Sequence, residues 1–115
     1  MTADRLYLCS LDEIEDPGTR GFVFPDLEKG RLVLVKKNGQ FTAFRNSCPH
    51  TGAPMEWKPD QFLDNENEFI QCSLHGALFD TQTGECLRGP CVGEFLQKES
   101  LLIDNKAVFW VSKTS

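Results

Sequence analysis

The sequence predicts an all-β fold, an antiparallel β-sandwich or barrel, from the spacing and composition of its apolar segments. Short runs of β-branched and aromatic residues recur along the 115 residues, each bounded by Gly, Pro, Asn or Asp. The run Arg31–Lys37 and the run 41–44 are joined by Asn38 and Gly39, a pair that tolerates the positive φ angles of a tight hairpin. Short, evenly spaced strands of this kind are typical of sandwiches and barrels.

The other predicted elements follow in chain order. Strands are expected at residues 6–9, 22–24, 69–71, 77–80, 85–87, 95–98, 101–103 and 108–111. The one helical signal is at residues 10–15, where Ser10 could cap a turn with Glu13 three residues later. The acidic stretch 60–68 is expected to be a solvated surface loop inside a single domain that spans residues 1–115.

Composition and charge narrow the functional classes. A hydrophobic fraction of 40% is ordinary for a globular protein, and no apolar run is long enough to span a bilayer. The first residues lack the basic start and apolar stretch of a signal peptide, so a cytoplasmic protein with no membrane partner is expected. A net charge of -5 argues against nucleic acid as a partner, because a duplex binder needs a footprint of Lys and Arg. Basic protein surfaces are the expected partners.

The chain places its only two histidines beside cysteines. Cys48 and His50 form a C-x-H pair, and Cys72 and His75 form a C-x-x-H pair. Thiolates and imidazoles suit zinc or an iron-sulfur centre and do not suit magnesium or calcium. Structural zinc sites usually pair Cys with Cys and His with His, whereas each pair here is mixed. The mixed spacing favours a binuclear centre; zinc, or buried thiols and imidazoles without a metal, are the alternatives.

At these two motifs the sequence resembles the Rieske family, whose signature matches "CPH" followed by "CSLHG". The resemblance implies a Rieske-like β-sandwich or barrel with a two-loop cluster-binding subdomain at about residues 46–91. It also implies one [2Fe-2S] cluster, bound by Cys48 and Cys72 on one iron and by His50 and His75 on the other. The turn sequence at 79–85 and the Gly89-Pro90 loop resemble further parts of the family, and the likeness extends over about residues 32–111.

The remaining cysteines and two positions near the motifs refine this interpretation. Five cysteines exclude a complete disulfide framework, and Cys9, Cys86 and Cys91 are predicted to be buried thiols, with a disulfide between Cys86 and Cys91 as the lesser alternative. By resemblance, Ala53 and Ser73 occupy positions where some members have a bridging cysteine pair. Likewise, Ala77 and Phe79 replace the Ser and Tyr hydroxyls of high-potential members, which implies a potential below zero.

No histidine remains for a second, mononuclear iron site, and the chain has no G-x-G-x-x-G dinucleotide motif. The sequence therefore predicts an electron carrier without its own substrate site, and the resemblance implies that His50 and His75 are the exit for the electron. The resemblance implies a ferredoxin that transfers electrons from a flavoprotein reductase to a terminal oxygenase or other redox enzyme. The alternative is a tightly bound small subunit of a larger oxidoreductase, such as an assimilatory nitrite reductase.

Overall fold

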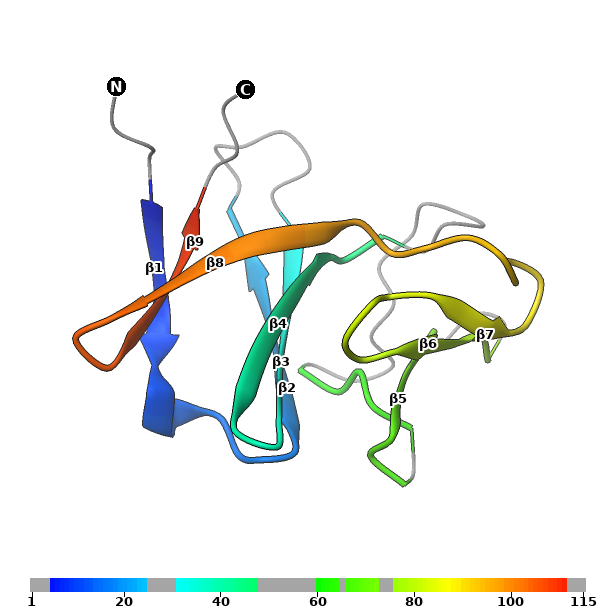
Figure 1. The fold of residues 1–115 in the computed structure, drawn as a ribbon, viewed down its shortest axis with the longest axis horizontal. Coiled ribbons are helices and arrows are strands. Elements are labelled where there is room, and N and C mark those ends of the chain that lie inside the picture. Colours follow the sequence, from blue (N-terminus) through cyan, green and yellow to red (C-terminus); the bar gives the residue numbers. More distant parts are fainter. Residues whose placement is uncertain (1–4, 25–30, 48–59, 65, 73–75, 112–115) are drawn as a thin grey trace.

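The computed structural model describes residues 5–24, 31–47, 60–64, 66–72 and 76–111, and these residues form two antiparallel sheets (Figure 1). The large sheet has the strand order β1-β9-β8-β4-β3-β2, and the small sheet has the order β5-β6-β7. The strands of the large sheet are β1 (Arg5–Ser10), β2 (Gly18–Val23), β3 (Arg31–Lys37), β4 (Gln40–Arg45), β8 (Lys98–Asp104) and β9 (Ala107–Val111). Those of the small sheet are β5 (Phe69–Gln71), β6 (Leu78–Asp80) and β7 (Cys86–Arg88). The all-β prediction is confirmed.

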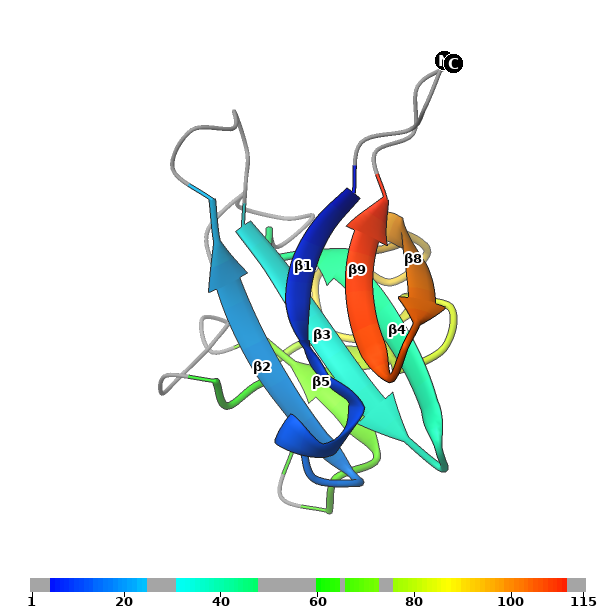
Figure 2. The same ribbon diagram turned by 90° about the vertical axis from the view of Figure 1, so that its left-hand side faces the viewer.

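The large sheet curls into a half-barrel, so that β1 and β9 lie across one face of β3 and β4 (Figure 2). Side chains from these strands meet inside the curl and form a core that we call the barrel core. Its buried members are Leu8, Cys9, Ile14, Leu32, Leu34, Ala43, Val108 and Trp110. Trp110 is only 5% exposed. The small sheet lies beyond the other face of β3 and β4 (Figure 1).

Strand β3 contributes to two cores because its alternate side chains point to opposite faces. Leu32 and Leu34 enter the barrel core, whereas Val33 and Val35 enter a second core between the two sheets. We call this second group the inter-sheet core, and it consists of Val33, Val35, Phe44, Phe62, Leu63, Ile70, Cys72, Ala77, Phe79, Cys86, Cys91 and Leu96. The need to fill both faces explains why β3 has a continuous apolar run rather than an alternating one.

The predicted hairpin between β3 and β4 is present, with φ angles of 54° at Asn38 and 77° at Gly39. The carboxylate of Asp16 accepts hydrogen bonds from both turn amides, at 2.8 Å from Asn38 N and 2.7 Å from Gly39 N. At the end of β1, a short 3-10 helix, η1 (Leu11–Glu13), follows Ser10 as predicted. The Ser10 amide donates to Glu13 Oε1 at 2.7 Å.

Two strand predictions were wrong in extent. Residues 95–98 were expected to form one strand, but β8 begins only at Lys98, and Phe95 makes an isolated bridge to Glu85. The segment crosses from one sheet to the other: the Leu96 amide donates to the Gly84 carbonyl, and the Gln97 carbonyl accepts from the Arg45 amide. Among the described residues, no one strand pairs with residues 95–97 along their whole length. Strand β2 begins at Gly18 rather than residue 22, since it pairs with β3 along its whole length.

The acidic stretch 60–68 is only partly the solvated loop that was predicted. Its carboxylates at Asp60, Glu66 and Glu68 are exposed, but Phe62 and Leu63 are buried in the inter-sheet core. Gly21 in β2 leaves room for the Phe62 ring, since a Cβ there would lie 3.1 Å from Phe62 Cζ. This segment therefore packs against β2 through the Phe62 ring, whereas Leu63 forms a bridge with Ile70.

Candidate metal centre

The structure describes one of the four predicted cluster ligands. Cys48, His50 and His75 lie outside the described residues, as do Ala53 and Ser73, whereas Cys72 directly follows β5. The Cys72 side chain is buried in the inter-sheet core. Within the described part of the chain, no three His, Cys, Asp or Glu side chains are grouped as a metal site. The geometry around Cys72 is therefore the part of the predicted centre that can be analysed.

Cys72 lies on the inward face of the β5–β6 hairpin. Its amide donates to the Ala77 carbonyl at 2.9 Å, and the Gly76 amide donates to the Cys72 carbonyl at 3.0 Å. Ile70, Ala77 and Phe79 share the same face, because buried and half-exposed residues alternate along both strands. These bonds make Cys72 and Ala77 cross-strand neighbours, with Phe79 on the diagonal, within reach of its large side chain. The second motif therefore spans the end of this hairpin.

The Gly89-Pro90 loop packs against the same hairpin at Ala77. Gly89 has a φ of 111°, and a Cβ added there would lie 2.9 Å from both Cα and Cβ of Ala77. Only glycine meets both conditions, because the backbone conformation and the close approach each disfavour a side chain. The Gly89-Pro90 loop thus closely approaches Ala77, the cross-strand partner of Cys72.

The chain that leads into the first motif is fixed by the side chain of Glu99, a residue that the sequence analysis missed. Glu99 Oε2 accepts from Arg45 Nε at 3.0 Å and from Gln97 Nε2 at 2.9 Å, and Glu99 Oε1 accepts from Trp110 Nε1 at 3.0 Å. The Glu99 side chain is only 8% exposed, so these are partly buried, charge-assisted hydrogen bonds. The Arg45 amide also donates to the Gln97 carbonyl at 2.8 Å. Glu99 therefore links the barrel core to the residues just before Cys48.

These surroundings fit an iron-sulfur centre. Cys72 is buried where water is excluded, and thiolate is the ligand type that such a cluster requires. Ala77 and Phe79 face the same core and have no hydroxyl to donate to a sulfur atom. In the sequence the first motif follows β4 and the second begins directly after β5, and both strands contribute side chains to the inter-sheet core.

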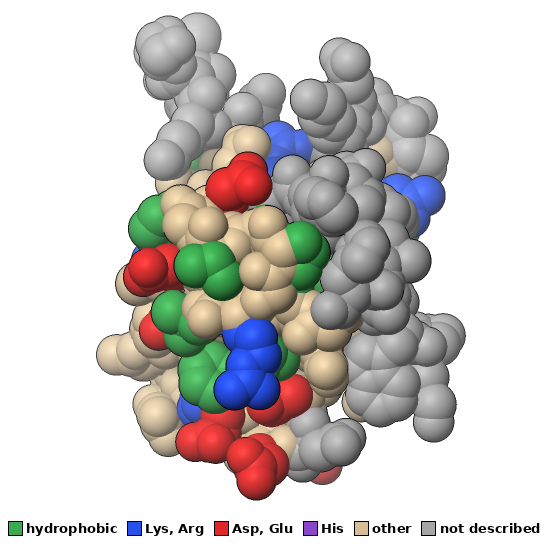
Figure 3. Space-filling model, turned by 90° about the vertical axis from the view of Figure 1, so that its right-hand side faces the viewer, with side chains coloured by type: hydrophobic (Ala, Val, Ile, Leu, Met, Phe, Trp, Pro, Cys, Tyr) green, Lys and Arg blue, Asp and Glu red, His purple; other side chains and the backbone are tan. Residues whose placement is uncertain are grey.

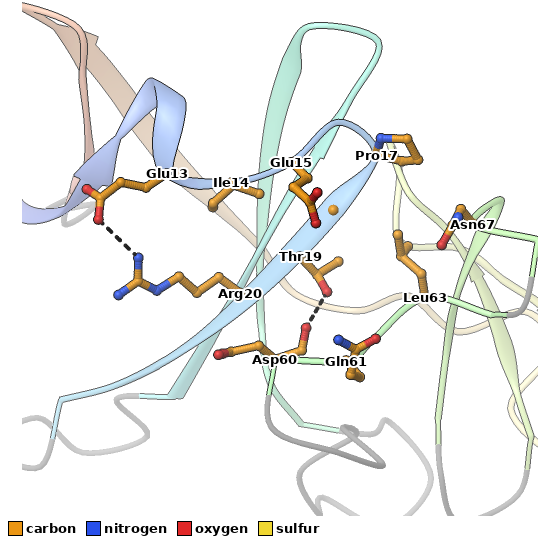
Figure 4. Close-up of a pocket in the computed structure, with 11 residues that line it drawn as sticks. Glu13, Ile14, Glu15, Pro17, Thr19, Arg20, Asp60, Gln61, Leu63 and Asn67 are labelled. Carbon is orange, nitrogen blue, oxygen red and sulfur yellow. Dashed lines mark hydrogen bonds and ion pairs between the residues drawn. The ribbon is translucent and has the colours of Figure 1, made fainter.

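A groove beside β2 is separate from the predicted cluster site at Cys72 (Figure 4). Its lining consists of Glu13, Ile14, Glu15, Pro17, Gly18, Thr19, Arg20, Asp60, Gln61, Leu63 and Asn67, and none of these is Cys or His. The Thr19 hydroxyl donates to the Asp60 carbonyl at 2.7 Å across it, and Arg20 Nη1 lies 3.5 Å from Glu13 Oε2. This groove is the seam where the acidic segment meets β2.

The other described cysteines are buried, as predicted. Cys9 is in the barrel core, and burial, followed by the nearby Glu13 carboxylate, raises the pKa of its thiol. Cys86 and Cys91 are each 1% exposed and lie on either side of the Gly89-Pro90 loop. Their sulfur atoms are 3.0 Å apart, in hydrogen-bond contact and farther apart than the roughly 2.05 Å of a disulfide bond.

Comparison with known proteins agrees with this arrangement. The family model described as "Rieske [2Fe-2S] domain" matches residues 4–106. The 3-phenylpropionate/cinnamic acid dioxygenase ferredoxin subunit of Photorhabdus laumondii subsp. laumondii is 30% identical over 84 residues, which cover 72% of this chain and 71% of that protein. Apoptosis-inducing factor 3 of Homo sapiens is 30% identical over 102 residues, which cover 89% of this chain but only 15% of that longer protein.

The solved structure of the ferredoxin of carbazole 1,9a-dioxygenase from Nocardioides aromaticivorans IC177 has the same fold. It superimposes with a TM-score of 0.74 at 21% identity, covering 95% of this chain and 98% of that one. No helix among the described residues is long and apolar enough to cross a membrane. The two sheets, the buried Cys72 hairpin and the match over residues 4–106 lead to one conclusion: the chain belongs to the Rieske [2Fe-2S] family.

Proposed function

We propose that this protein is a one-electron carrier whose [2Fe-2S] cluster is held by Cys48, His50, Cys72 and His75 within one domain spanning residues 1–115. The observation that supports it most directly is the position of Cys72. The residue is buried at the end of a hairpin whose turn contains the second motif, and both flanking backbone hydrogen bonds are made. The chain belongs to a family named for this cluster.

Cys48 and Cys72 would supply the two thiolate ligands and His50 and His75 the two imidazole ligands, and the bound cluster would supply one-electron redox chemistry. The residues of this chain prepare that site. The inter-sheet core keeps water from Cys72, and Glu99 fixes the strand end that precedes Cys48. The absence of hydroxyls on Ala77 and Phe79 leaves fewer donors to the sulfurs, which supports a low potential.

The proposed partners are a flavoprotein reductase as donor and a terminal oxygenase, or another redox enzyme, as acceptor. The similarity to a dioxygenase ferredoxin subunit supports this pairing. The acidic net charge of -5 favours basic docking surfaces on both partners. We propose a cytoplasmic location. We also propose that the protein has no substrate site of its own, because the four proposed ligands include both histidines of the chain.

The described part of the surface at the small-sheet end supports a transient rather than a permanent contact. Leu87, Val92 and Phe95, on β7 and the following loop, are exposed. Among the described residues on the face in Figure 3, hydrophobic side chains are interspersed with acidic and basic ones. A permanent subunit, such as the small subunit of a nitrite reductase, would be expected to present a larger continuous apolar surface. We therefore favour the ferredoxin role over the subunit role.

Metal analysis of the purified protein tests the cluster. We expect about two irons and two sulfides per chain, as in a [2Fe-2S] centre, together with the visible absorbance of such a centre. Cys72→Ser should lose that absorbance, whereas Cys9→Ser, a change of the same kind at a buried thiol in the barrel core, should keep it. Stoichiometric zinc in the protein, or an unchanged spectrum in Cys72→Ser, would contradict the proposal.

Salt dependence and co-elution test the role of the protein. Electron transfer from a reductase should slow as ionic strength rises, because charge attraction is screened within about 10 Å at 0.1 M salt. The protein should elute separately from its redox partners in size-exclusion chromatography. Stable co-elution with a large oxidoreductase, together with rates that ignore salt, would favour the subunit role instead.

A further inference from the structure

We propose that Cys86 and Cys91 are a redox modification site, where a low-molecular-weight disulfide such as oxidised glutathione converts the two thiols into a reversible intramolecular disulfide. The proposal concerns thiols outside the four proposed cluster ligands, and it does not depend on the electron-carrier role. It is motivated by the contact between two buried sulfur atoms that enclose a short surface loop.

The geometry of the pair is already close to that of a disulfide. The two sulfur atoms are 3.0 Å apart, so bond formation requires an approach of only about 1 Å. The Cys86 thiol also donates to the Arg88 carbonyl at 3.3 Å. The two sulfur atoms therefore already meet, with Cys86 on β7 and Cys91 in the turn that follows it.

Backbone hydrogen bonds hold the two cysteines opposite each other. The Cys86 amide donates to the Glu94 carbonyl at 2.8 Å, and the Glu94 amide donates to the Cys91 carbonyl at 2.9 Å. The enclosed residues 87–90 are all exposed, so the loop that joins the two thiols lies at the surface. A local opening of this loop is enough to admit a small oxidant, and it does not require global unfolding.

The reaction is two successive thiol-disulfide exchanges. One cysteine, as its thiolate, attacks a sulfur of the small disulfide, forms a mixed disulfide and releases one small thiolate. The second cysteine, also as its thiolate, attacks the protein-side sulfur of that mixed disulfide and releases the other small thiolate. Together the two protein thiols lose two protons and two electrons, and the small disulfide gains them as two thiols. A reducing thiol reverses both steps.

Cys9 provides the contrast within the chain. It is buried in the barrel core, among Leu, Ile, Val, Ala and Trp side chains and apart from the other described cysteines, and burial raises the pKa of its thiol. A thiol of this kind reacts slowly and has no partner cysteine in its core. Cys72 is excluded as a partner because it is a proposed cluster ligand. Among the described cysteines, the pair Cys86 and Cys91 is therefore the one placed for exchange.

The disulfide would also restrain the loop that rests on the cluster hairpin. Gly89, inside the enclosed loop, touches Ala77, so a covalent closure limits how far the loop can move from that contact. Amide exchange at Glu94, whose hydrogen bond goes to the Cys91 carbonyl, should therefore be at least several-fold slower in the oxidised protein.

Peptide mapping of the cluster-loaded protein tests the proposal. The protein is equilibrated with oxidised glutathione, its remaining thiols are alkylated in denaturant, and the chain is cleaved after Glu85, Arg88 and Glu94. These cuts place Cys86 in peptide 86–88 and Cys91 in peptide 89–94. We expect the two peptides to remain joined, with a joined mass lower by two hydrogen atoms than the sum of the two reduced peptides, and to separate on reduction.

Three variants serve as controls. Cys9→Ala should give the joined peptides as the wild type does, whereas Cys86→Ala and Cys91→Ala should give none. Two separate alkylated peptides at every glutathione ratio would overturn the proposal. So would stable glutathione adducts on both cysteines of the wild type, because the second exchange would then have failed. Neither result would bear on cluster content, which is measured separately.

Discussion

The two cores on either side of β3 differ in where their side chains come from. The barrel core is built almost entirely from strands of the large sheet, with Ile14 as its loop contribution. The inter-sheet core takes Phe62, Leu63, Cys91 and Leu96 from connecting segments as well as residues from both sheets. Of the four described cysteines, only Cys9 lies in the barrel core, and the other three lie in the inter-sheet core. The barrel core therefore serves as a scaffold, whereas the inter-sheet core contains Cys72, the described ligand of the proposed cluster.

This difference shows how a small chain separates stability from reactivity. The barrel core can be filled by regular strand alternation, which needs no special residue. The inter-sheet core must hold loops in fixed positions, and it uses a thiol at Cys72 and a glycine at Gly89 for purposes other than packing. Perturbations of equal size in the two cores should therefore have equal effects on stability and unequal effects on the cluster.

The largest effect is expected at Glu99, where the two regions are joined. Glu99→Ala removes the carboxylate that accepts hydrogen bonds from Arg45 Nε and Trp110 Nε1. These two partly buried donors then lose that hydrogen bond. We expect a loss of about 3 kcal/mol in the free energy of unfolding, with faster loss of the cluster. Chemical denaturation monitored by circular dichroism measures the first effect, and visible absorbance measures the second. Glu94→Ala, at an exposed position, should change neither.

A matched pair of valines tests the comparison directly. Val33 and Val108 are both fully buried, Val33 in the inter-sheet core and Val108 in the barrel core. Each Val→Ala change should lower the free energy of unfolding by about 2 kcal/mol, from lost transfer energy and a small cavity. Only Val33→Ala should also speed cluster loss at a fixed temperature below the unfolding transition. Equal rates of cluster loss in both variants would mean that the two cores are not distinct in function.

An added hydroxyl in the inter-sheet core should change the potential. Phe79→Tyr places a donor on the diagonal neighbour of Cys72, whereas Phe109→Tyr adds the same group on β9, in the other sheet. A hydrogen bond that favours the reduced cluster by about 1 kcal/mol raises a one-electron potential by about 40 mV. The parent potential should lie below zero, in the lower part of the Rieske span of about -150 to +300 mV. Voltammetry that finds equal shifts in both variants would contradict the argument.

The parts that sequence predicted best are those with local signals. The Asn38-Gly39 hairpin, the strand at residues 108–111 and the capped turn at Ser10 each depend on neighbouring residues, and each is confirmed. The second motif could be placed near a strand end because β5 and β6 are short apolar runs on either side of it.

The features that the sequence did not predict depend on contacts between different segments of the chain. Phe62 is buried because it meets Gly21, and no local pattern in an acidic stretch indicates that partner. Glu99 binds Arg45, which is far from it in sequence, and Trp110 on the paired strand β9, and a glutamate in a strand pattern gives no hint of this role. The contact of Cys86 with Cys91 was left open because spacing alone does not determine the distance between two sulfurs.

The smallest effect is expected at the rim of the barrel core, from the carboxylate of Glu13. The Ser10 amide donates to it at 2.7 Å, and this hydrogen bond, with a further contribution from Arg20, holds the pKa of Glu13 below its ordinary value. A lowered pKa in the folded state means that the folded protein binds this proton less tightly than the unfolded chain. The stabilisation is therefore fully present above the ordinary glutamate pKa of about 4.3 and is lost as pH falls through the lower folded value.

Glu13→Gln tests this, because it keeps an acceptor for Ser10 but removes the charge. The melting temperature of the wild type should exceed that of the variant slightly at pH 7, and the difference should shrink toward zero as the solution is acidified below about pH 4. The reduction potential should be the same in both proteins, since Glu13 lies next to Ile14 of the barrel core and not in the inter-sheet core. A change in potential would show that charge at the barrel rim reaches the cluster, and the separation of scaffold from chemistry would then be incomplete.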